Sequence, residues 1–433
     1  MEPRTPIAME LLAPAGGMEQ LRAAVRFGAD AVYLAAERFG MRARAANFAM
    51  DELPAAVALA HEGGAKAYVT CNILMHEADM AALPPYLRAL EAAGVDGLIV
   101  SDLGAFALAR DLVPGIPLHV STQASVANAA AARLWHELGA QRIVCAREMS
   151  LADIARLREA TPPELELEAF VHGAMCMAVS GRCLISSYLT GRSGNKGHCT
   201  QPCRWGYTLE EEKRPGVHFP VEEDGRSTFI MNAQDLCMVE HLQALADAGV
   251  ASVKIEGRNK KAFYVASVVG AYRRVLDGEP AAQVAPELRA VSHRPYGTGF
   301  YFGEAAQATD YDGYEQECLH VADVLGCVPS AGAARTYIYV RCRNRFSEGE
   351  ALELLAPGGA AQPLPVRNLC WLPDARPDDS ELPPASAVEA VPVANRTEAV
   401  YRFELEGSAG RAVGGTFLRA RRFRRSSRSG VAA

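Results

Sequence analysis

Four cysteines lie close together in the middle of the chain, and their type and spacing could hold a metal. They fall within 28 residues, at Cys176, Cys183, Cys199 and Cys203. Thiolates at short spacings bind soft metal ions or iron–sulfur clusters. The surrounding segment, 171–209, contains no Asp or Glu but carries Arg182, Arg192, Lys196 and Arg204. Positive charge favours thiolates and attracts anionic substrates, so this segment is the first candidate for function.

The spacing of these thiols favours an iron–sulfur cluster over zinc but leaves the ligand set open. Six residues separate Cys176 from Cys183, and three separate Cys199 from Cys203. Structural zinc sites usually use two pairs of ligands with roughly two to four residues between the members of a pair. A fifth thiol, Cys237, stands at the predicted start of a helix, where the helix dipole favours a thiolate, and could replace one of the four. Thiols that bind no metal are the third interpretation.

The composition limits the class of protein. The chain has 433 residues, of which 49% are hydrophobic and 22% charged, and its formal net charge is −7. These values are typical of a soluble protein with one large and one small domain, and they exclude a surface that is basic throughout. No apolar run of about 18 residues predicts a membrane span, and the N-terminus shows no signal peptide. We expect a cytoplasmic protein with no membrane partner, whose scattered cysteines are reduced.

A repeated pattern in the first 260 residues predicts the scaffold that positions the thiols. A helix ends in Gly, and a short β-rich run follows, at Gly28, Gly64, Gly94, Gly139 and Gly249. Gly after a helix turns the chain back into a strand. The predicted strands cover 9–13, 31–35, 66–70, 98–101, 118–122, 142–146, 165–171 and 252–255. Eight βα units predict an α/β fold, a TIM-like (β/α)8 barrel over 1–305, because the doubly wound alternative would show a Gly-rich phosphate loop after its first strand.

The predicted barrel has a long insertion after its seventh strand, over residues 171–251. The insertion carries the clustered cysteines, acidic stretches at 210–212 and 222–224, and a predicted short strand at 229–232. In a barrel this segment leaves the C-terminal end of a strand, which is the face on which such folds build active sites. We therefore expect the cysteines to lie at the mouth of the barrel.

Polar residues at the ends of the predicted strands form a second group of candidates. They are Asn72, Asp102, Ser121, Gln123, Arg147, Glu148, His172, Glu256 and Arg258. Each one alone could cap a helix or satisfy a loop, whereas together they could line one cavity. Lys260 and Lys261 would add positive charge near the mouth, where contacts to phosphates supply most of the affinity for nucleic acid. Trp205 and Tyr207 could stack on a base or anchor a loop.

The C-terminal third changes to a β pattern. A helix runs to about residue 277, a linker begins at Gly278-Glu-Pro280, and an aromatic, Gly-rich stretch at 292–302 is expected to pack on the barrel. Short predicted strands separated by turn residues indicate a small all-β barrel or sandwich over 317–405. The final segment, 407–433, has seven Arg and no acidic residue, and its composition predicts disorder. It is either a solubilising tail or a basic arm that reaches phosphates.

Several motifs resemble those of the U32 peptidase family, the collagenase-like proteins of unassigned catalytic type. The longest is the run from Glu168 through Val-His172-Gly-Ala-Met-Cys176 to Cys183-Leu-Ile-Ser-Ser. The others are Met9-Glu-Leu-Leu-Ala-Pro-Ala-Gly16, Cys199-Thr-Gln-Pro-Cys203-Arg, Asp235-Leu-Cys237, Lys254-Ile-Glu-Gly-Arg258 and Thr298-Gly-Phe-Tyr-Phe302. Arg343-Asn-Arg-Phe346, followed by Gly349 and Glu353-Leu-Leu, is similar to the C-terminal β domain of the subgroup that hydroxylates tRNA.

This resemblance implies a function and a cofactor. Members of the subgroup take part in forming 5-hydroxyuridine at the wobble position of tRNA, and prephenate, a small anion, is implicated as the hydroxyl source. Studied relatives carry a 4Fe-4S cluster, which implies Cys176, Cys183, Cys199 and Cys203 as ligands here, with Cys237 as a substitute. The candidate catalytic residues are Glu168, His172, Glu256 and Arg258. The candidate substrate contacts are Asn72, Gln123, Arg147, Arg182 and Arg204.

Two other classes of function stay open at this point. A peptidase needs a nucleophile, a base and an orienting group, and neither Gly-x-Ser-x-Gly nor His-Glu-x-x-His occurs. A pair formed by His172 and Cys176 is the remaining candidate for proteolysis. A non-enzymatic scaffold, in which the cluster only holds the insertion for a partner hydroxylase, is the third interpretation. Relatives that modify 23S rRNA or support ubiquinone hydroxylation leave the substrate itself open.

Overall fold

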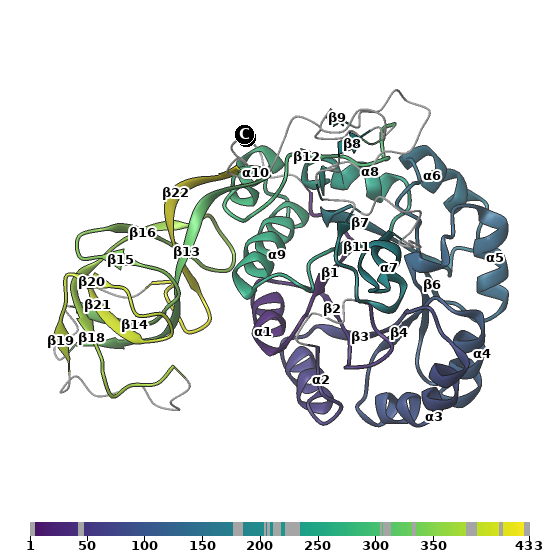
Figure 1. Cartoon of the computed structure of the whole chain (residues 1–433), viewed down its shortest axis with the longest axis horizontal. Helices are drawn as coiled ribbons and strands as arrows, with labels where there is room; N and C mark the ends of the chain where they lie inside the picture. Colours follow the sequence, from purple (N-terminus) through teal and green to yellow (C-terminus); the bar gives the residue numbers. More distant parts are fainter. Residues whose placement is uncertain are drawn as a thin grey trace.

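A computed structural model gives the architecture of the chain (Figure 1). The residues that the structure describes are 5–41, 47–175, 185–202, 205, 208–210, 218–220, 234–303, 305, 313–330, 335–377, 388–406 and 410–427. Within these ranges no helix is long and apolar enough to cross a membrane.

Eight parallel strands close into a barrel. They are β1 (Glu10–Pro14), β2 (Ala31–Leu34), β3 (Lys66–Cys71), β4 (Gly97–Val100), β5 (Leu118–Val120), β6 (Arg142–Val144), β7 (Glu166–Ala174) and β11 (Ser252–Ile255). Neighbours in this order pair in parallel, and β11 closes the ring by pairing with both β7 and β1. The TIM-like barrel predicted from the repeat is confirmed, with its strands at the predicted places.

Helices surround the barrel, as the repeat predicts. They are α1 (Met18–Arg26), α2 (Leu53–Glu62), α3 (Glu77–Ala92), α4 (Leu103–Leu112), α5 (Ala129–Glu137), α6 (Leu151–Glu159), α8 (Leu242–Asp247) and α9 (Ala262–Leu276). The five glycines of the repeat all have positive φ, from 74° at Gly94 to 111° at Gly139. This left-handed conformation strains other residues, which explains why Gly recurs where each helix gives way to a strand.

The insertion between β7 and β11 adds short elements above the barrel. They are α7 (Ile185–Thr190), η3 (Gly194–Lys196), β8 (Thr208–Glu210), β9 (His218–Pro220), β10 (Asp235–Cys237) and η5 (Val239–His241). Strand β10 runs antiparallel to β7 and parallel to β12 (Tyr296–Gly297), so the aromatic stretch after α9 packs on the barrel. The predicted strand at 229–232 and the acidic stretch at 222–224 lie outside the described residues.

The C-terminal domain is an antiparallel sheet preceded by α10 (Ala281–Leu288), which begins where the sequence predicts a linker. Its eight-stranded sheet has the order β17-β16-β22-β13-β14-β21-β18-β19. The strands are β13 (Gly313–Pro329), β14 (Arg335–Cys342), β16 (Ala351–Leu355), β17 (Gln362–Pro365), β18 (Arg367–Trp371), β19 (Glu389–Ala390), β21 (Val400–Glu406) and β22 (Phe417–Ser427), and a separate pair is formed by β15 (Phe346–Ser347) and β20 (Val393–Ala394). We call this unit the β domain.

The predicted disorder of segment 407–433 is wrong for residues 417–427. These residues form β22, which pairs with β13 on one side and β16 on the other. Phe417 and Leu418 are buried, and Arg419 is buried between Glu287 and Glu353, with N–O distances of 2.7 and 2.8 Å. The Arg-rich composition suggested an unpaired tail because the acidic residues that neutralise it lie far away in the sequence.

Removing β22 is expected to unfold the β domain. A chain truncated after residue 406 loses a strand that lies third from one edge of the sheet, so β16 and β17 lose their link to β13. The stability of a whole domain is about 5–15 kcal/mol, and a central strand carries a large share of it. Thermal unfolding followed by circular dichroism tests this. A chain truncated after residue 427 is the matched control, and equal melting curves for both truncations would contradict the assignment.

Candidate active site

Residues that follow strands β3 and β5 are hydrogen-bonded to one another on one side of the barrel mouth. Asn72, which follows β3, donates from Nδ2 to Ser121 Oγ after β5 at 3.1 Å, and its Oδ1 accepts from the Met41 N–H at 3.2 Å. The Ser121 hydroxyl also accepts from the Gln123 N–H at 3.3 Å. The structure therefore brings the predicted residues Asn72, Ser121 and Gln123 together. By contrast, the Asp102 carboxylate caps helix α4 by accepting from the Ala105 N–H.

The opposite side of the mouth holds an ion pair. Arg147, after β6, lies 3.4 Å from the carboxylate of Glu256, after β11, and the two side chains are only 10% and 15% exposed. The Arg147 guanidinium also lies over the ring of Phe170, 4.0 Å from its centre. An aromatic face and a carboxylate together hold a cation in place while leaving donors for a second anion. This pair joins residues that the sequence placed on two different strands.

Arg258 lies deeper than the sequence suggested. Its side chain is 3% exposed, and its carbonyl oxygen would stand 1.9 Å from a Cβ added at Gly16. The loop after β1 therefore needs Gly at this position so that the loop after β11 can pack against it. The backbone of Arg258 thus joins the two loops at the mouth, and its buried side chain stays a candidate for the site.

His172, in β7, is buried among aromatic rings. Its Nδ1 is 3.3 Å from the hydroxyl of Tyr272, and its ring lies 5.3 Å from that of Tyr296. Burial, aided by the charges of His293 and Lys260, lowers the pKa of His172 to about 3. The imidazole is therefore neutral near pH 7 and a weak proton acceptor, so its chemistry is that of a neutral hydrogen-bonding group and not of a fixed cation.

Glu168 lies inside the barrel, away from the mouth. Its side chain is 0% exposed, and its carboxylate contacts Lys254 Nζ at 2.8 Å and Arg142 Nη1 at 3.2 Å. Arg142 also pairs with Glu10 at 2.6 Å, and Tyr68 donates to the same carboxylate at 2.8 Å. Burial raises the pKa of Glu10, but the Arg142 and Tyr68 contacts outweigh it, and the net pKa lies below its ordinary value.

This charged network supports the floor of the mouth. The Lys254 ammonium lies 4.5 Å from the ring centre of Tyr33 and 5.5 Å from that of Phe170, the ring over which the Arg147 guanidinium lies.

The sequence reasoning missed the roles of Glu10, Arg142 and Lys254. A usable signal is present in β7, where Glu166, Glu168 and His172 fall on one face of the strand and the residues between those positions on the other face are apolar. Polar residues at every second position of a buried strand indicate a polar barrel interior.

Two of the five candidate thiols are described. Cys199 Sγ accepts a hydrogen bond from the Gln201 N–H at 3.3 Å, a contact that suits a metal-bound thiolate. Burial raises the pKa of Cys237 to about 11, so this thiol would ionise only beside a metal ion. Cys237 pairs in register with His172, at the start of segment 171–209, which we call the cysteine segment. Cys176, Cys183, Cys203, Arg182 and Arg204 lie outside the described residues, and so does Tyr207.

The described residues alone do not form a complete metal site. No group of three or more His, Cys, Asp and Glu within them could hold a metal ion. Among the predicted basic residues, Lys196 pairs with Asp79 of α3. Trp205 is 42% exposed and Tyr188 is 89% exposed, so the insertion presents aromatic surface above the barrel.

Comparison with known proteins places the chain in a family. Residues 16–310 match the model of Peptidase family U32, which is more than half of the chain. A "tRNA hydroxylation protein P1" of Bacillus subtilis is 37% identical over 367 residues, which cover 80% of this chain and 83% of that protein. The chain belongs to the U32 peptidase family. The resemblance in the motifs is therefore confirmed.

Other members of the U32 peptidase family carry different names. An "Uncharacterized protease MJ0090" of Methanocaldococcus jannaschii is 39% identical over 321 residues, or 72% of this chain and 77% of that protein. A "23S rRNA 5-hydroxycytidine C2501 synthase" of Escherichia coli is 38% identical over 269 residues, or 62% of this chain and 39% of that protein. Family membership alone therefore leaves both RNA hydroxylation and proteolysis to be weighed.

The described part of this U32 peptidase family member shows no protease-like constellation. Ser186 is buried and donates to the Arg192 carbonyl at 2.7 Å, within a group that includes Thr200. His172 contacts Tyr272, and no serine or cysteine in the described ranges is hydrogen-bonded to a histidine. A nucleophile, a base and an orienting group in mutual contact are the mark of acyl transfer. Ser186 instead holds its own loop together, and His172 is packed in strand β7.

Proposed function

We propose that this protein is an RNA hydroxylase that converts the wobble uridine of tRNA to 5-hydroxyuridine. The observation that carries the proposal is the similarity to a protein named for tRNA hydroxylation over 80% of this chain. That span is longer than the barrel alone and so includes part of the β domain. A second RNA-modifying relative, named as an rRNA 5-hydroxycytidine synthase, supports hydroxylation at the same position of a pyrimidine ring.

The reaction sets requirements that the proposed cofactor and co-substrate meet. Replacing the C5–H bond of uridine by C5–OH removes two electrons from the base. The hydroxyl donor must therefore also be the oxidant: it gives up its hydroxyl oxygen and takes up two electrons and the hydrogen displaced from C5. We propose prephenate as the hydroxyl source and a 4Fe-4S cluster on Cys176, Cys183, Cys199 and either Cys203 or Cys237. When bound, such a cluster supplies one-electron transfer or a Lewis-acidic iron. The backbone donor to Cys199 Sγ is the feature of the described site that fits it.

The protein's own residues would bind and orient the two substrates. Arg147 offers a planar cation held by Glu256 and Phe170, which suits a carboxylate of prephenate. Asn72 and Gln123 on the facing side offer amide groups for the uracil edge. His172, whose pKa is lowered to about 3, stays neutral and can orient a group by hydrogen bonding.

Removing the Arg147 cation should slow the reaction without unfolding the protein. We expect Arg147→Ala to lower the rate of uridine hydroxylation about 100-fold, because misplacing a bound reactant by about 1 Å costs that much. Arg147→Lys should restore little, since an ammonium cannot form the same paired contacts. The rate of nucleoside formation is measured by mass spectrometry, with Arg156→Ala on the exposed face of α6 as the control. Equal rates for Arg147→Ala and wild type would remove Arg147 from the site.

The peptidase alternative rests on the name of the MJ0090 relative. One experiment separates the two functions. Anaerobically purified protein is incubated with unmodified tRNA and prephenate in one arm, and with gelatin in the other. The proposal predicts uridine that gains the mass of one oxygen atom and gelatin that stays intact. Cleaved gelatin with unchanged RNA would overturn it.

We also propose that the protein acts in the cytoplasm, and the same assay shows whether it needs a partner protein. Modification by the purified chain alone would exclude the non-catalytic scaffold for a partner hydroxylase. Modification that requires a cell extract would instead support a scaffold.

A further inference from the structure

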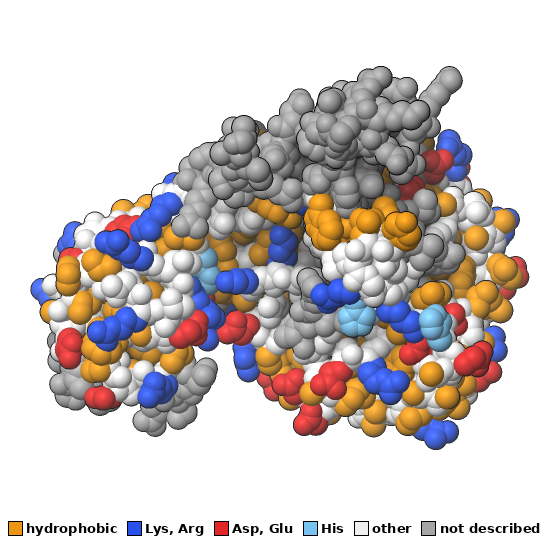
Figure 2. Space-filling view, in the orientation of Figure 1, with side chains coloured by type: hydrophobic (Ala, Val, Ile, Leu, Met, Phe, Trp, Pro, Cys, Tyr) orange, Lys and Arg blue, Asp and Glu red, His pale blue; other side chains and the backbone are white. Residues whose placement is uncertain are grey.

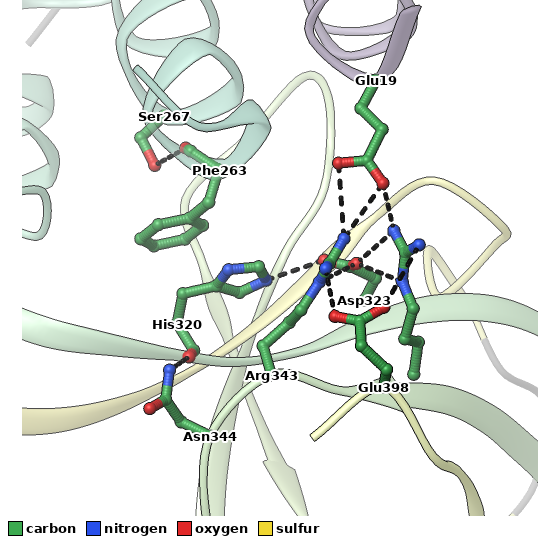
Figure 3. Close-up of polar contacts among 9 residues, drawn as sticks. Glu19, Phe263, Ser267, His320, Asp323, Arg343, Asn344 and Glu398 are labelled. Carbon is green, nitrogen blue, oxygen red and sulfur yellow. Dashed lines mark hydrogen bonds and ion pairs between the residues drawn. The ribbon is translucent and has the colours of Figure 1, made fainter. Parts of the chain in front are cut away.

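A dense ionic cluster joins the β domain to the barrel (Figure 3). Glu19 of α1 pairs with Arg341 at 2.7 Å and with Arg343 at 3.1 Å, and both arginines pair with Asp323 of β13 at 2.8 and 2.7 Å. Glu398 contacts Arg343 as well. Three carboxylates thus face two guanidinium groups, and the imidazole of His320 contacts Asp323 as well, at 2.8 Å. The cluster fixes the orientation of the β domain against α1 and α9, which lie on the side of the barrel that faces it (Figure 1).

A hollow of about 460 Å³ lies beside this cluster. Its walls come from α1, from the loop that follows β11, from the start of α9 and from the β domain. Figure 2 shows charged side chains gathered at this seam between the two domains. The volume is within the range of a site for a small molecule or a nucleotide. Lys260 of its wall adjoins the mouth, but Asn72, Gln123, Arg147, His172 and Glu256 do not line the hollow, so it is distinct from the candidate active site.

Three side-chain amides in this hollow are oriented by the backbone. Gln20 donates from Nε2 to the Lys260 carbonyl at 3.1 Å, Gln316 donates to that of Cys318 at 2.7 Å, and Asn344 donates to that of His320 at 2.8 Å. Each amide thereby uses its NH₂ group within the protein and keeps its carbonyl oxygen as an acceptor. Acceptors held in this way suit the N–H groups on the edge of an unpaired base.

Aromatic and cationic groups complete the hollow. The rings of Phe263 and His320 are stacked, with their centres 4.8 Å apart and an angle of 10° between their planes. Lys261 is exposed at the start of α9 and makes no ion pair with any residue in the described ranges. The two rings cover each other and Phe263 is buried, so they form a rigid part of the wall. The contacts that the hollow offers to a nucleotide are the amide acceptors, for the base, and the Lys261 ammonium group, for the phosphate.

A second hollow of about 680 Å³ continues along the same joint. The two hollows share Glu19, Ala262 and Asp323 in their walls, so they are neighbours. The second one is lined by Arg22 and Arg26, one turn apart on α1, against the carboxylate of Glu62. Neither arginine forms an ion pair with a described residue. Glu19 and Asp323 in the shared wall are paired with Arg341 and Arg343. The arginines of α1 and Lys261 therefore provide cations at both ends, which matches a polymer of phosphates better than a single nucleotide.

We infer that the joint between the barrel and the β domain binds a single-stranded stretch of RNA. This inference rests on the proposed function and names the surface that holds the substrate outside the reactive site. The loop that carries Lys260 and Lys261 begins at Glu256 of the barrel mouth, so a strand lying in the joint passes close to the mouth. The ionic cluster holds the two walls of the groove at a fixed separation.

Binding of a fluorescent RNA oligonucleotide with the anticodon-loop sequence tests this inference, by anisotropy on the full-length protein. Lys261→Glu is expected to weaken binding about tenfold and to lower the slope of log affinity against log salt by about 1. Arg22→Glu should weaken binding similarly. Lys66→Glu, at the exposed start of β3 on the far end of the barrel, makes the same change of charge as Lys261→Glu and should stay within twofold of wild type.

Several outcomes would overturn the inference. Wild-type affinity in Lys261→Glu would do so, and so would equal weakening in Lys66→Glu, which would indicate general charge repulsion. Weakening at Lys261 but not at Arg22 would overturn the continuous groove. Displacement of the RNA by uridine monophosphate at concentrations near the Kd of the RNA would show a mononucleotide site instead. Melting temperatures of all variants verify folding.

The binding assay separates this inference from the proposed function, because it needs no turnover. A wild-type chain that binds RNA through Lys261 and Arg22 but leaves uridine unchanged would refute the hydroxylase and keep the groove. If the wild-type chain hydroxylates uridine but the Lys261→Glu and Arg22→Glu variants bind RNA with wild-type affinity, the groove is refuted and the hydroxylase stands.

Discussion

Replacing Cys183 or Cys199 by alanine is expected to abolish both the visible absorbance of an iron–sulfur cluster and the hydroxylation of uridine. A cubane cluster needs four thiolate ligands, and losing one removes the charge and geometry that hold the iron. Anaerobically purified variants are compared for absorbance, iron and sulfide content, and nucleoside formation. We expect a loss of activity of at least about 100-fold, which corresponds to about 2.7 kcal/mol in the barrier.

Cys370→Ala is the matched control, because this thiol lies in β18 of the β domain, outside the cysteine segment. It should keep the colour and the activity. The same assay on Cys203→Ala and Cys237→Ala identifies the fourth ligand, since only one of the two should lose the cluster. Variants of Cys183 and Cys199 that lose the colour but still hydroxylate uridine would show that the cluster, if present, is structural.

Removing the buried carboxylate of Glu168 is expected to destabilise the barrel strongly. Glu168→Ala would leave Arg142 and Lys254 inside the barrel without this partner. Breaking a buried ion pair by deleting one member costs about 3–5 kcal/mol, because the remaining charge stays buried. Chemical denaturation of the purified variant measures the change in the free energy of unfolding.

Glu166→Ala is the control for this effect. Glu166 lies two residues earlier in the same strand and pairs with the same Arg142 at 2.6 Å, but its side chain is 49% exposed. An exposed pair contributes about 0–1 kcal/mol, so this variant should stay near wild type. A Glu168→Ala protein with unchanged stability and lost hydroxylation would contradict the supporting role and would return Glu168 to the catalytic residues.

The barrel was predictable because its signal is local and repeated. Each Gly that ends a helix marks the next strand, and the positive φ of Gly94 and Gly139 shows the physical reason. The mouth residues Asn72, Arg147 and Glu256 were also within reach, since parallel strands bring their C-terminal ends to one rim. The contacts of Asn72 with Ser121 and of Arg147 with Glu256 could not be predicted, because the choice of partner depends on the order of strands around a closed barrel.

Features that depend on distant partners escaped prediction. The sequence of strand β22 predicts a charged tail, because it does not show that Glu287 and Glu353 lie beside Arg419. Likewise, the sequence motif predicts a catalytic role for Glu168, because it does not show that Arg142 and Lys254 surround this carboxylate. In both cases the composition of a segment gave its charge correctly but could not show how that charge is neutralised.

The groove at the joint had no signal in the sequence. Its amides come from Gln20, Gln316 and Asn344, which belong to three separate parts of the chain and to two domains. No spacing rule connects such residues, because their proximity arises from the docking of the β domain on α1 and α9. The ionic cluster around Asp323 and the packing of Phe417 against Phe27 and Phe263 show that this docking is specific.

Mass spectrometry of tRNA nucleosides from a strain that lacks this gene tests the central claim most directly. The account predicts that 5-hydroxyuridine and the nucleosides made from it disappear from the wobble position and return when the wild-type chain is supplied. Unchanged levels of these nucleosides in the deletion strain would contradict the assignment as a tRNA hydroxylase.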